Sequence, residues 1–150
     1  MNELRDLYQE MILEHSRSPR NHRCIDDTEH KAEGYNPLCG DEVKIFVSLE
    51  DERVQDVSFV GSGCAISMAS ASILTEILRG KTKSEAEELF GKFHSLVTGQ
   101  NPETGDIGKL QVFAGVSEFP ARVKCATLAW HTFRSALEEP TDDQGPVTTE

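Results

Sequence analysis

The chain has 150 residues, the usual length of one globular domain, and can bury a hydrophobic core without disulfides. Its formal net charge is -11 and its basic residues are scattered, which argues against a nucleic-acid-binding surface. No apolar stretch approaches the ~20 residues of a membrane-spanning helix, and no signal peptide is visible. We therefore expect a cytoplasmic protein with no membrane partner. In that compartment its 4 cysteines stay reduced, which favours metal or catalytic chemistry over disulfides.

The N-terminal half of the chain predicts one helix and a hairpin. Apolar residues from Leu4 to Ile12 recur at helical spacing, and this helix should stop before Pro19. A weak strand pattern covers 31–35. Apolar and polar residues then alternate from Val43 to Leu49, and a charged turn leads into a second strand at Val54–Val60. The two strands predict an antiparallel hairpin.

Two helices are expected next. The first has apolar residues at helical spacing over Ile66–Leu78 and ends at Gly80, a residue suited to a C-terminal cap. The second begins at Ser84, where Glu87 three residues later completes a capping-box pattern.

The remaining chain predicts a short helical piece within 107–115 and a last helix after Pro120. The polar segment 140–150 predicts a disordered tail, so the folded domain should comprise residues 1–139. A helix, two or three strands and further helices indicate an α+β domain. Its small antiparallel sheet of about three strands should carry helices on one face.

Three cysteines lie where the predicted structure changes type. Cys39 is in a turn before the hairpin and is followed by Asp41, while Cys64 lies between the second strand and a helix. Cys125 is near the start of the last helix, close to the basic residues Arg122 and Lys124. Helix N-termini and basic neighbours favour thiolate, the form of cysteine that binds metals and attacks sulfur. Three thiolates and a carboxylate are a possible tetrahedral zinc site.

Spacing alone leaves two interpretations open. The intervals between these cysteines lack the close pairs of a zinc finger. The cysteines either share a metal or are buried as small hydrophobic side chains.

Three sequence blocks carry a family resemblance. They read NPLCGD at Asn36–Asp41, GSGCAISMASAS at Gly61–Ser72 and FPARVKCATLAW at Phe119–Trp130. In this order they resemble the signature blocks of the IscU-like iron–sulfur cluster assembly proteins, whose group includes the N-terminal domain of NifU. The resemblance covers most of the chain, up to about Glu139, and implies the IscU-like fold.

Two features make the chain most similar to the SufU branch. Lys124 stands where the scaffold branch usually has a histidine before the third cysteine. The long interval between Cys64 and Cys125 is typical of an insertion in the SufU branch, which would include much of Ser84–Gly105.

The resemblance implies a zinc-dependent, sulfurtransferase-like protein that activates a SufS-type cysteine desulfurase and supplies a downstream Suf cluster-assembly scaffold. By position, Cys39, Asp41, Cys64 and Cys125 are the implied zinc ligands. Cys39 is the implied acceptor of persulfide sulfur, and Arg122 matches an arginine that steadies the site. Two alternatives stay open: a scaffold that holds a transient [2Fe–2S] cluster or iron on the same residues, and a non-catalytic domain that zinc stabilises.

The other candidate ligands are set aside. Cys24 lies in a polar loop outside every matched block and is expected to be a free surface cysteine. None of the 5 histidines is assigned to the metal.

Overall fold

The computed structural model describes residues 3–25, 28, 30–37, 40–99, 108–137 and 147–148. Its elements in chain order are α1 (Glu3–Arg17), β1 (His30–Asn36), β2 (Asp41–Glu50), β3 (Arg53–Ser62), α2 (Ala65–Leu78), α3 (Lys83–Thr98), the 3₁₀ helix η1 (Gly108–Glu118), α4 (Pro120–Leu137) and β4 (Val147–Thr148).

The sheet has the strand order β3-β2-β1-β4, and its three long strands are antiparallel. The hairpin between β2 and β3 turns at Asp51 and Glu52, which both have positive φ angles. Two successive residues with positive φ angles form a tight turn whose twist matches the right-handed twist of the flanking strands. In the register of the hairpin, Glu42 lies opposite Ser62, so the start of β2 meets the end of β3.

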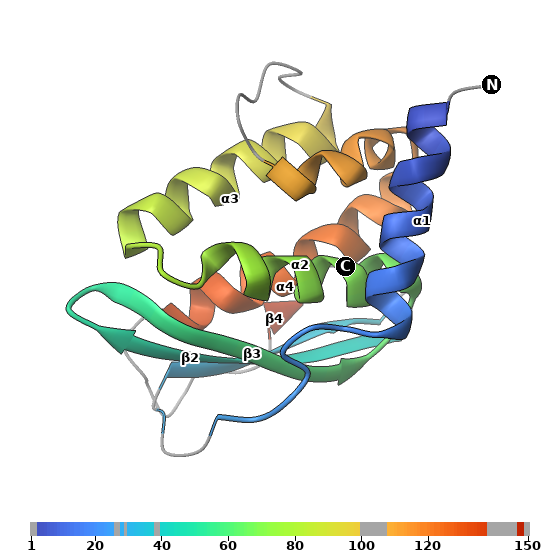
Figure 1. Ribbon diagram of the computed structural model, residues 1–150. Coiled ribbons are helices and arrows are strands. Elements are labelled where there is room, and N and C mark those ends of the chain that lie inside the picture. Colours follow the sequence, from blue (N-terminus) through green and yellow to red (C-terminus); the bar gives the residue numbers. More distant parts are fainter. Residues whose placement is uncertain are drawn as a thin grey trace.

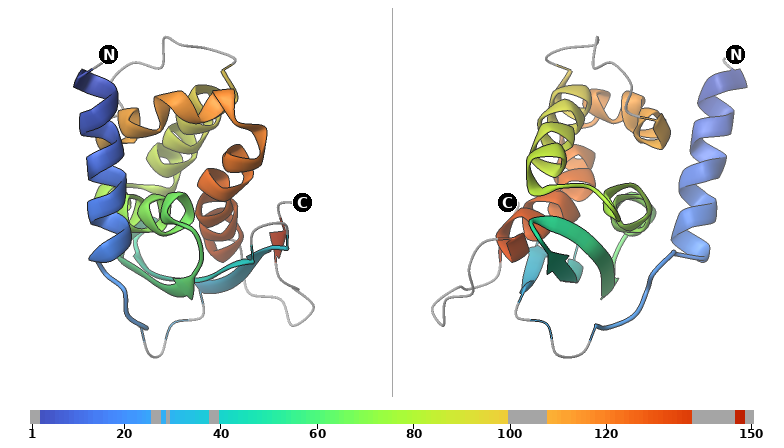
Figure 2. Two further views of the ribbon diagram at one scale, coloured as in Figure 1. Left: turned by 90° about the vertical axis from the view of Figure 1, so that its right-hand side faces the viewer. Right: turned by 60° about the vertical axis from the view of Figure 1, so that its left-hand side comes forward.

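The helices cover one face of the sheet, as the sequence predicts (Figure 1). α4 packs on β1 and β2, and α2 lies beside it against β3. α1 stands at one end of this helical layer and packs on α2 and η1 (Figure 2). The core between the layers contains Phe59 from the sheet and Trp130 and Phe93 from the helices, all buried. The α+β architecture with a small antiparallel sheet is therefore confirmed.

The start of α3 corrects one prediction. Its N-cap is Thr82, which forms a capping box with Glu85, rather than Ser84 with Glu87. Both pairs fit the capping pattern, but Thr82 forms a β-bridge with Arg53, and this holds it in the extended conformation that an N-cap needs. The contact that selects the start of the helix is therefore a tertiary one.

Two further elements differ from the expectations. The helical piece expected within 107–115 is a 3₁₀ helix that continues to Glu118. Within the segment 140–150, the described residues Val147–Thr148 form a short strand parallel to β1. The disorder of this segment and the domain boundary after residue 139 stay predictions.

Within the described ranges, no helix combines the length and the apolar character needed to cross a membrane.

Candidate metal centre

Asp41 is the first residue of β2, and its side chain is buried, with 0 % of its surface exposed. Its Oδ1 accepts a hydrogen bond from the backbone N–H of Cys64 over 2.8 Å. Gly63 makes this approach possible, because a Cβ atom at Gly63 would overlap with the carboxylate of Asp41. The pairing of β2 with β3 thus brings the Asp41 carboxylate to the start of α2.

Cys64 is the N-cap residue of α2, with extended backbone angles. Its Sγ accepts a hydrogen bond from the backbone N–H of Ser67 over 3.5 Å and lies 3.9 Å from Oδ2 of Asp41. An N-cap side chain meets the partial positive charge of the helix N-terminus, which favours a thiolate. The side chain is half-buried, so the sulfur remains within reach of the surface.

Cys125 lies in the second turn of α4 and is fully buried. Its Sγ receives a hydrogen bond from the side-chain amide of Asn36, the last residue of β1, over 3.7 Å. Because α4 packs on β1, the sulfur faces the end of the sheet where β2 begins. α4 is therefore the third element, after β2 and α2, that places the side chain of a possible metal ligand at this end of the sheet.

Asp41, Cys64 and Cys125 together form a possible metal-binding group, in which the three ligand atoms lie within 4.8 Å of one another. Two sulfurs and a carboxylate oxygen suit zinc, and thiolates also accept iron. The hydrogen bond with Cys125 lowers the pKa of Cys64 to about 6, and the Ser67 and Ile66 amides act in the same direction. Burial and the Asp41 carboxylate oppose this shift. At neutral pH Cys64 is therefore largely thiolate, the protonation state that binds a metal.

The structure brings together three of the four residues for which the sequence predicts metal binding. The fourth, Cys39, lies outside the described residues. Arg122 is exposed in the first turn of α4 and lines the same cavity as Cys64. Cys24 is exposed and free, as expected.

The sequence reasoning missed two residues that shape this centre. Asn36 contacts the sulfur of Cys125 from a fully buried position, and Gly63 leaves room for the carboxylate of Asp41. Both belong to the blocks quoted above, next to or near a cysteine. Their place in these blocks is the only signal in the sequence that points to them, because neither burial nor a side-chain contact can be read from it.

Comparison with known proteins places these observations in a family. The family model of the NifU-like N terminal domain matches residues 7–126. This match includes all the described residues of the centre.

Two curated relatives match over nearly their whole length. The chain is 37% identical to the iron-sulfur cluster assembly scaffold protein IscU of Streptococcus pyogenes serotype M1, and the match covers 96% of this chain and 91% of that protein. It is 38% identical to the zinc-dependent sulfurtransferase SufU of Bacillus subtilis, over 87% of this chain and 89% of that protein.

A crystal structure shows the same fold. It is that of a putative iron-sulfur cluster assembly scaffold protein for the SUF system from Fervidobacterium islandicum AW-1, with a TM-score of 0.80 and 35% identity. The match covers 86% of this chain and 95% of that one. The chain therefore belongs to the family of the NifU-like N terminal domain, together with proteins named IscU and SufU.

Proposed function

We propose that this protein is a zinc-dependent sulfurtransferase of iron–sulfur cluster assembly, which accepts persulfide sulfur on Cys39 from a SufS-type cysteine desulfurase and passes it to a downstream Suf scaffold. The observation that carries the proposal is the convergence of Asp41, Cys64 and Cys125 from three separate elements. Cys39 precedes Asp41 by two residues in the sequence, and the family resemblance implies that it is a ligand as well. The similarity to the Bacillus subtilis protein supports the same function.

The donor set fits zinc. Asp41, Cys64 and Cys125 offer one oxygen and two sulfurs, and Cys39 completes a four-ligand set of the kind that zinc takes. When bound, zinc stabilises deprotonated thiols and needs no change of oxidation state. The hydrogen bonds to the sulfurs of Cys64 and Cys125 hold these two side chains in place.

The chemical step is a thiol–persulfide exchange. The Cys39 thiolate attacks the outer sulfur of the partner's persulfide, a new sulfur–sulfur bond forms at Cys39, and the old one breaks. The partner's cysteine leaves as thiolate, so the electrons balance without another oxidant or reductant. Arg122 places a positive charge beside Cys64 at the cavity, where anionic sulfur must arrive.

The experiment combines this protein with a SufS-type desulfurase and cysteine. Wild type should raise desulfurase turnover and gain one sulfur atom in its intact mass, and Cys39→Ala should do neither. Cys24→Ser is the matched control, since it removes an exposed cysteine, and it should behave as wild type. A Cys39→Ala protein that stimulates the desulfurase as well as wild type would falsify the proposal.

A second candidate function is assembly of a transient [2Fe–2S] cluster on the same residues. The similarity to the Streptococcus pyogenes protein favours it, whereas Lys124 favours sulfur transfer. Anaerobic reconstitution with iron and sulfide separates the two functions. Stable visible absorbance would support the scaffold, and tightly held, colourless zinc would support sulfur transfer. If zinc only stabilised the domain, chelation would unfold it and no desulfurase would respond to it.

A further inference from the structure

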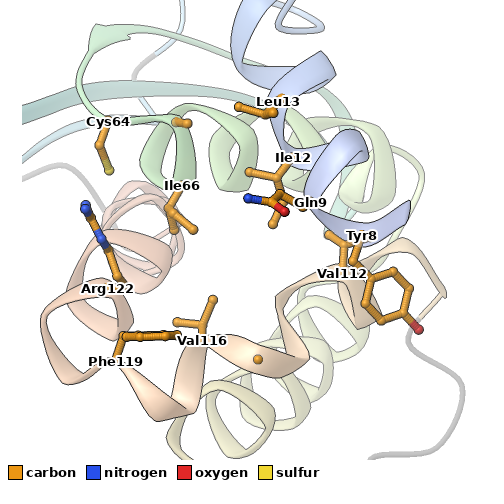
Figure 3. Close-up of a pocket in the computed structure, with 12 residues that line it drawn as sticks. Tyr8, Gln9, Ile12, Leu13, Cys64, Ile66, Val112, Val116, Phe119 and Arg122 are labelled. Carbon is orange, nitrogen blue, oxygen red and sulfur yellow. The ribbon is translucent and has the colours of Figure 1, made fainter. Parts of the chain in front are cut away.

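Two histidines that the candidate metal centre does not use, His94 of α3 and His131 of α4, lie next to each other where these helices pack together (Figure 2). The centroids of their imidazole rings are 6.4 Å apart, and the ring planes are inclined by 77°. Both side chains are half-buried, so water reaches the pair. The cavity beside the candidate metal centre is lined by residues around Cys64 and Arg122 and includes neither histidine (Figure 3).

The ring of Phe90 contacts both imidazoles. His94 stacks on it, with the centroids 6.2 Å apart and the planes 8° from parallel, and His131 meets it edge to face at 5.1 Å. The guanidinium of Arg134 also lies over this ring, 5.4 Å from its centroid, and Glu87, 3.5 Å from Arg134, offsets its charge. Because Phe90 restricts the rotamers of both histidines, their rings are held in one arrangement before any ligand binds.

The ring nitrogens of the pair differ from those of two other histidines in their hydrogen bonding. In the part of the chain that the structure describes, the rings of His94 and His131 form no hydrogen bond to the protein. By contrast, Nδ1 of His15 bonds to Ser72, and Nδ1 of His30 bonds to the carbonyl of Ala136. Each imidazole has two nitrogens that can bond. Those of His94 and His131 are therefore available to a ligand from solution.

The protonation of the pair favours a metal. Burial is the largest cause that lowers the pKa of His131, and the neighbouring His94 and Arg134 act in the same direction. His131 is therefore neutral at neutral pH, and neutral imidazole is the form that binds a metal ion. A proton on one ring would repel a proton on the other, whereas a shared ion accepts a lone pair from each ring.

The spacing of the rings fits a shared ion. A zinc–nitrogen bond is about 2.0–2.1 Å long and the imidazole centroid lies roughly 1.2 Å behind the bound nitrogen, so two rings on one ion have centroids about 5–6.5 Å apart. The observed 6.4 Å lies within this range. Among the described residues, the only group of three or more possible ligands is the one at Cys64, so water would complete the coordination between the two histidines.

We propose that His94 and His131 form a second metal site, which binds a divalent transition-metal ion such as zinc, copper or nickel through two imidazoles and water. Imidazole is a preferred ligand of these ions. The site is open because the protein supplies two of its ligands, and an ion bound there links α3 to α4 and stabilises their packing. The proposal does not rest on the proposed function, since it uses no residue of the cysteine centre.

Aromatic packing around Phe90 is the competing explanation, and phenylalanine substitutions separate it from metal binding. His94→Phe and His131→Phe keep a ring that packs on Phe90 but remove the nitrogens. His22→Phe is the matched control, because His22 also meets a phenylalanine ring edge to face, that of Phe59 at 5.0 Å, and it lies on neither α3 nor α4.

Nickel is the probe, because imidazole binds it well. It is titrated into protein that has been incubated with one equivalent of zinc, and zinc content is measured before and after. Wild type should bind one nickel ion without releasing zinc. His94→Phe and His131→Phe should each weaken nickel binding about 100-fold, the loss expected when one of two linked ligands is removed. His22→Phe should bind nickel as wild type does.

Two further measurements locate the ion and its effect. Paramagnetic nickel should broaden the NMR signals of the His94 and His131 rings and leave those of His22 and His30 sharp. Without nickel, both phenylalanine variants should unfold near the wild-type temperature. Nickel at about 100 times its dissociation constant should raise the unfolding temperature of wild type by about 5 °C or more, and should not raise that of either variant.

Equal nickel affinity in wild type, His94→Phe and His131→Phe would place the ion elsewhere on the protein and overturn the proposal. The absence of any nickel bound beyond the zinc, or broadening of His22 in place of the pair, would do the same. If a phenylalanine variant lost stability without metal and still bound nickel as tightly as wild type, the two histidines would serve packing alone.

Discussion

The side-chain amide of Asn36 donates a hydrogen bond to the sulfur of Cys125 over 3.7 Å, although the two residues are 89 positions apart in the chain. Both are fully buried, with 0 % of their surfaces exposed. A hydrogen bond to a ligand atom orients it and tunes how strongly it binds a metal. Asn36 is therefore a positioning residue for Cys125.

On the proposed zinc site, Asn36→Ala should weaken zinc binding about 10- to 100-fold, since the sulfur of Cys125 loses the hydrogen bond from Asn36. Competition with a chromophoric chelator measures the affinity. Cobalt substitution gives a second readout, because the sulfur-to-cobalt absorption bands should shift if the position or charge of the Cys125 sulfur changes. A variant that binds zinc and cobalt as wild type does would refute the role of Asn36.

Ser58→Ala is the matched control for this experiment. Ser58 lies in β3 and is fully buried, and within the described part of the chain its hydroxyl has no hydrogen-bond partner. Removing an unpaired buried hydroxyl should leave zinc binding unchanged and should stabilise the fold by about 1 kcal/mol.

Gly63→Ala should displace the carboxylate of Asp41. The added methyl group would overlap with Oδ1 and crowd the backbone of Asp41. Since the φ angle of Gly63 is not positive, the cost comes from this contact rather than from the backbone. We expect zinc affinity to fall about tenfold or more and stability to fall by about 1–3 kcal/mol. Metal titration and thermal unfolding measure the two effects.

Gly91→Ala is the control for this substitution. Gly91 lies within α3, and a Cβ atom there would meet no atom within 4 Å. Alanine should therefore stabilise the helix by about 0.5–1 kcal/mol and leave zinc binding unchanged. Equal zinc affinity in both variants would show that Gly63 has no special role.

Local patterns in the sequence were sufficient for the main elements. The alternation of apolar and polar residues from Val43 to Leu49 predicts β2, because successive side chains of a strand point to opposite faces of the sheet. The start of α3 was predicted at the wrong residue, because Thr82–Glu85 and Ser84–Glu87 fit the same local pattern. Only the bridge from Arg53 to Thr82 separates them, and it depends on how distant segments pack.

Some features of the candidate site can likewise be predicted from the local sequence, and others depend on tertiary packing. The position of Cys64 between a strand and a helix follows from local patterns, whereas its role as the N-cap of α2 is known only from the structure. The contact of Asn36 with Cys125 does not follow from local patterns, because it needs α4 to lie on β1. The room that Gly63 leaves for Asp41 depends on the register of β2 against β3. Both are consequences of tertiary packing that spacing along the chain does not contain.

The thiolate of Cys64 should form at unusually low pH in the metal-free protein. Its hydrogen bond with Cys125 lowers the pKa of Cys64 to about 6, so the thiolate predominates above that pH. The thiolate's ultraviolet absorbance, taken as the difference from Cys64→Ser, should titrate with a midpoint near pH 6. Cys125→Ala removes the bond and should move the midpoint up toward about 8.5, the usual value for cysteine. A wild-type midpoint near that usual value would contradict the prediction.

The same shift links pH to stability. A lowered pKa means that the unfolded chain binds the proton more tightly than the folded one does. The contribution of Cys64 to stability is therefore fully present above about pH 8.5 and is lost as pH falls to about 6. Unfolding of the metal-free protein by urea should show this loss, and Cys64→Ser should not.

His15 should make the fold sensitive to acid. Its side chain is buried between α1 and α2, where Nδ1 lies 2.7 Å from Oγ of Ser72 and Nε2 lies 3.6 Å from Glu76. Burial is the largest cause that lowers the pKa of His15, Arg20 and Lys109 add to it, and Glu76 and Glu14 oppose it. The folded protein therefore holds His15 neutral at a pH where the unfolded chain already binds a proton.

The sign of the effect follows from this difference. The stability that neutral His15 contributes is present above about pH 6.5 and is lost as pH falls from there toward the lower pKa of the folded state. His15→Gln should cost about 1–3 kcal/mol near pH 7.5, because it disturbs the buried contact with Ser72. Its stability should then depend less on pH between 7.5 and 5.5 than that of wild type. His22→Gln, at an exposed position, should keep the wild-type dependence. If thermal unfolding shows parallel pH curves for His15→Gln and wild type, protonation of His15 does not open the contact between α1 and α2.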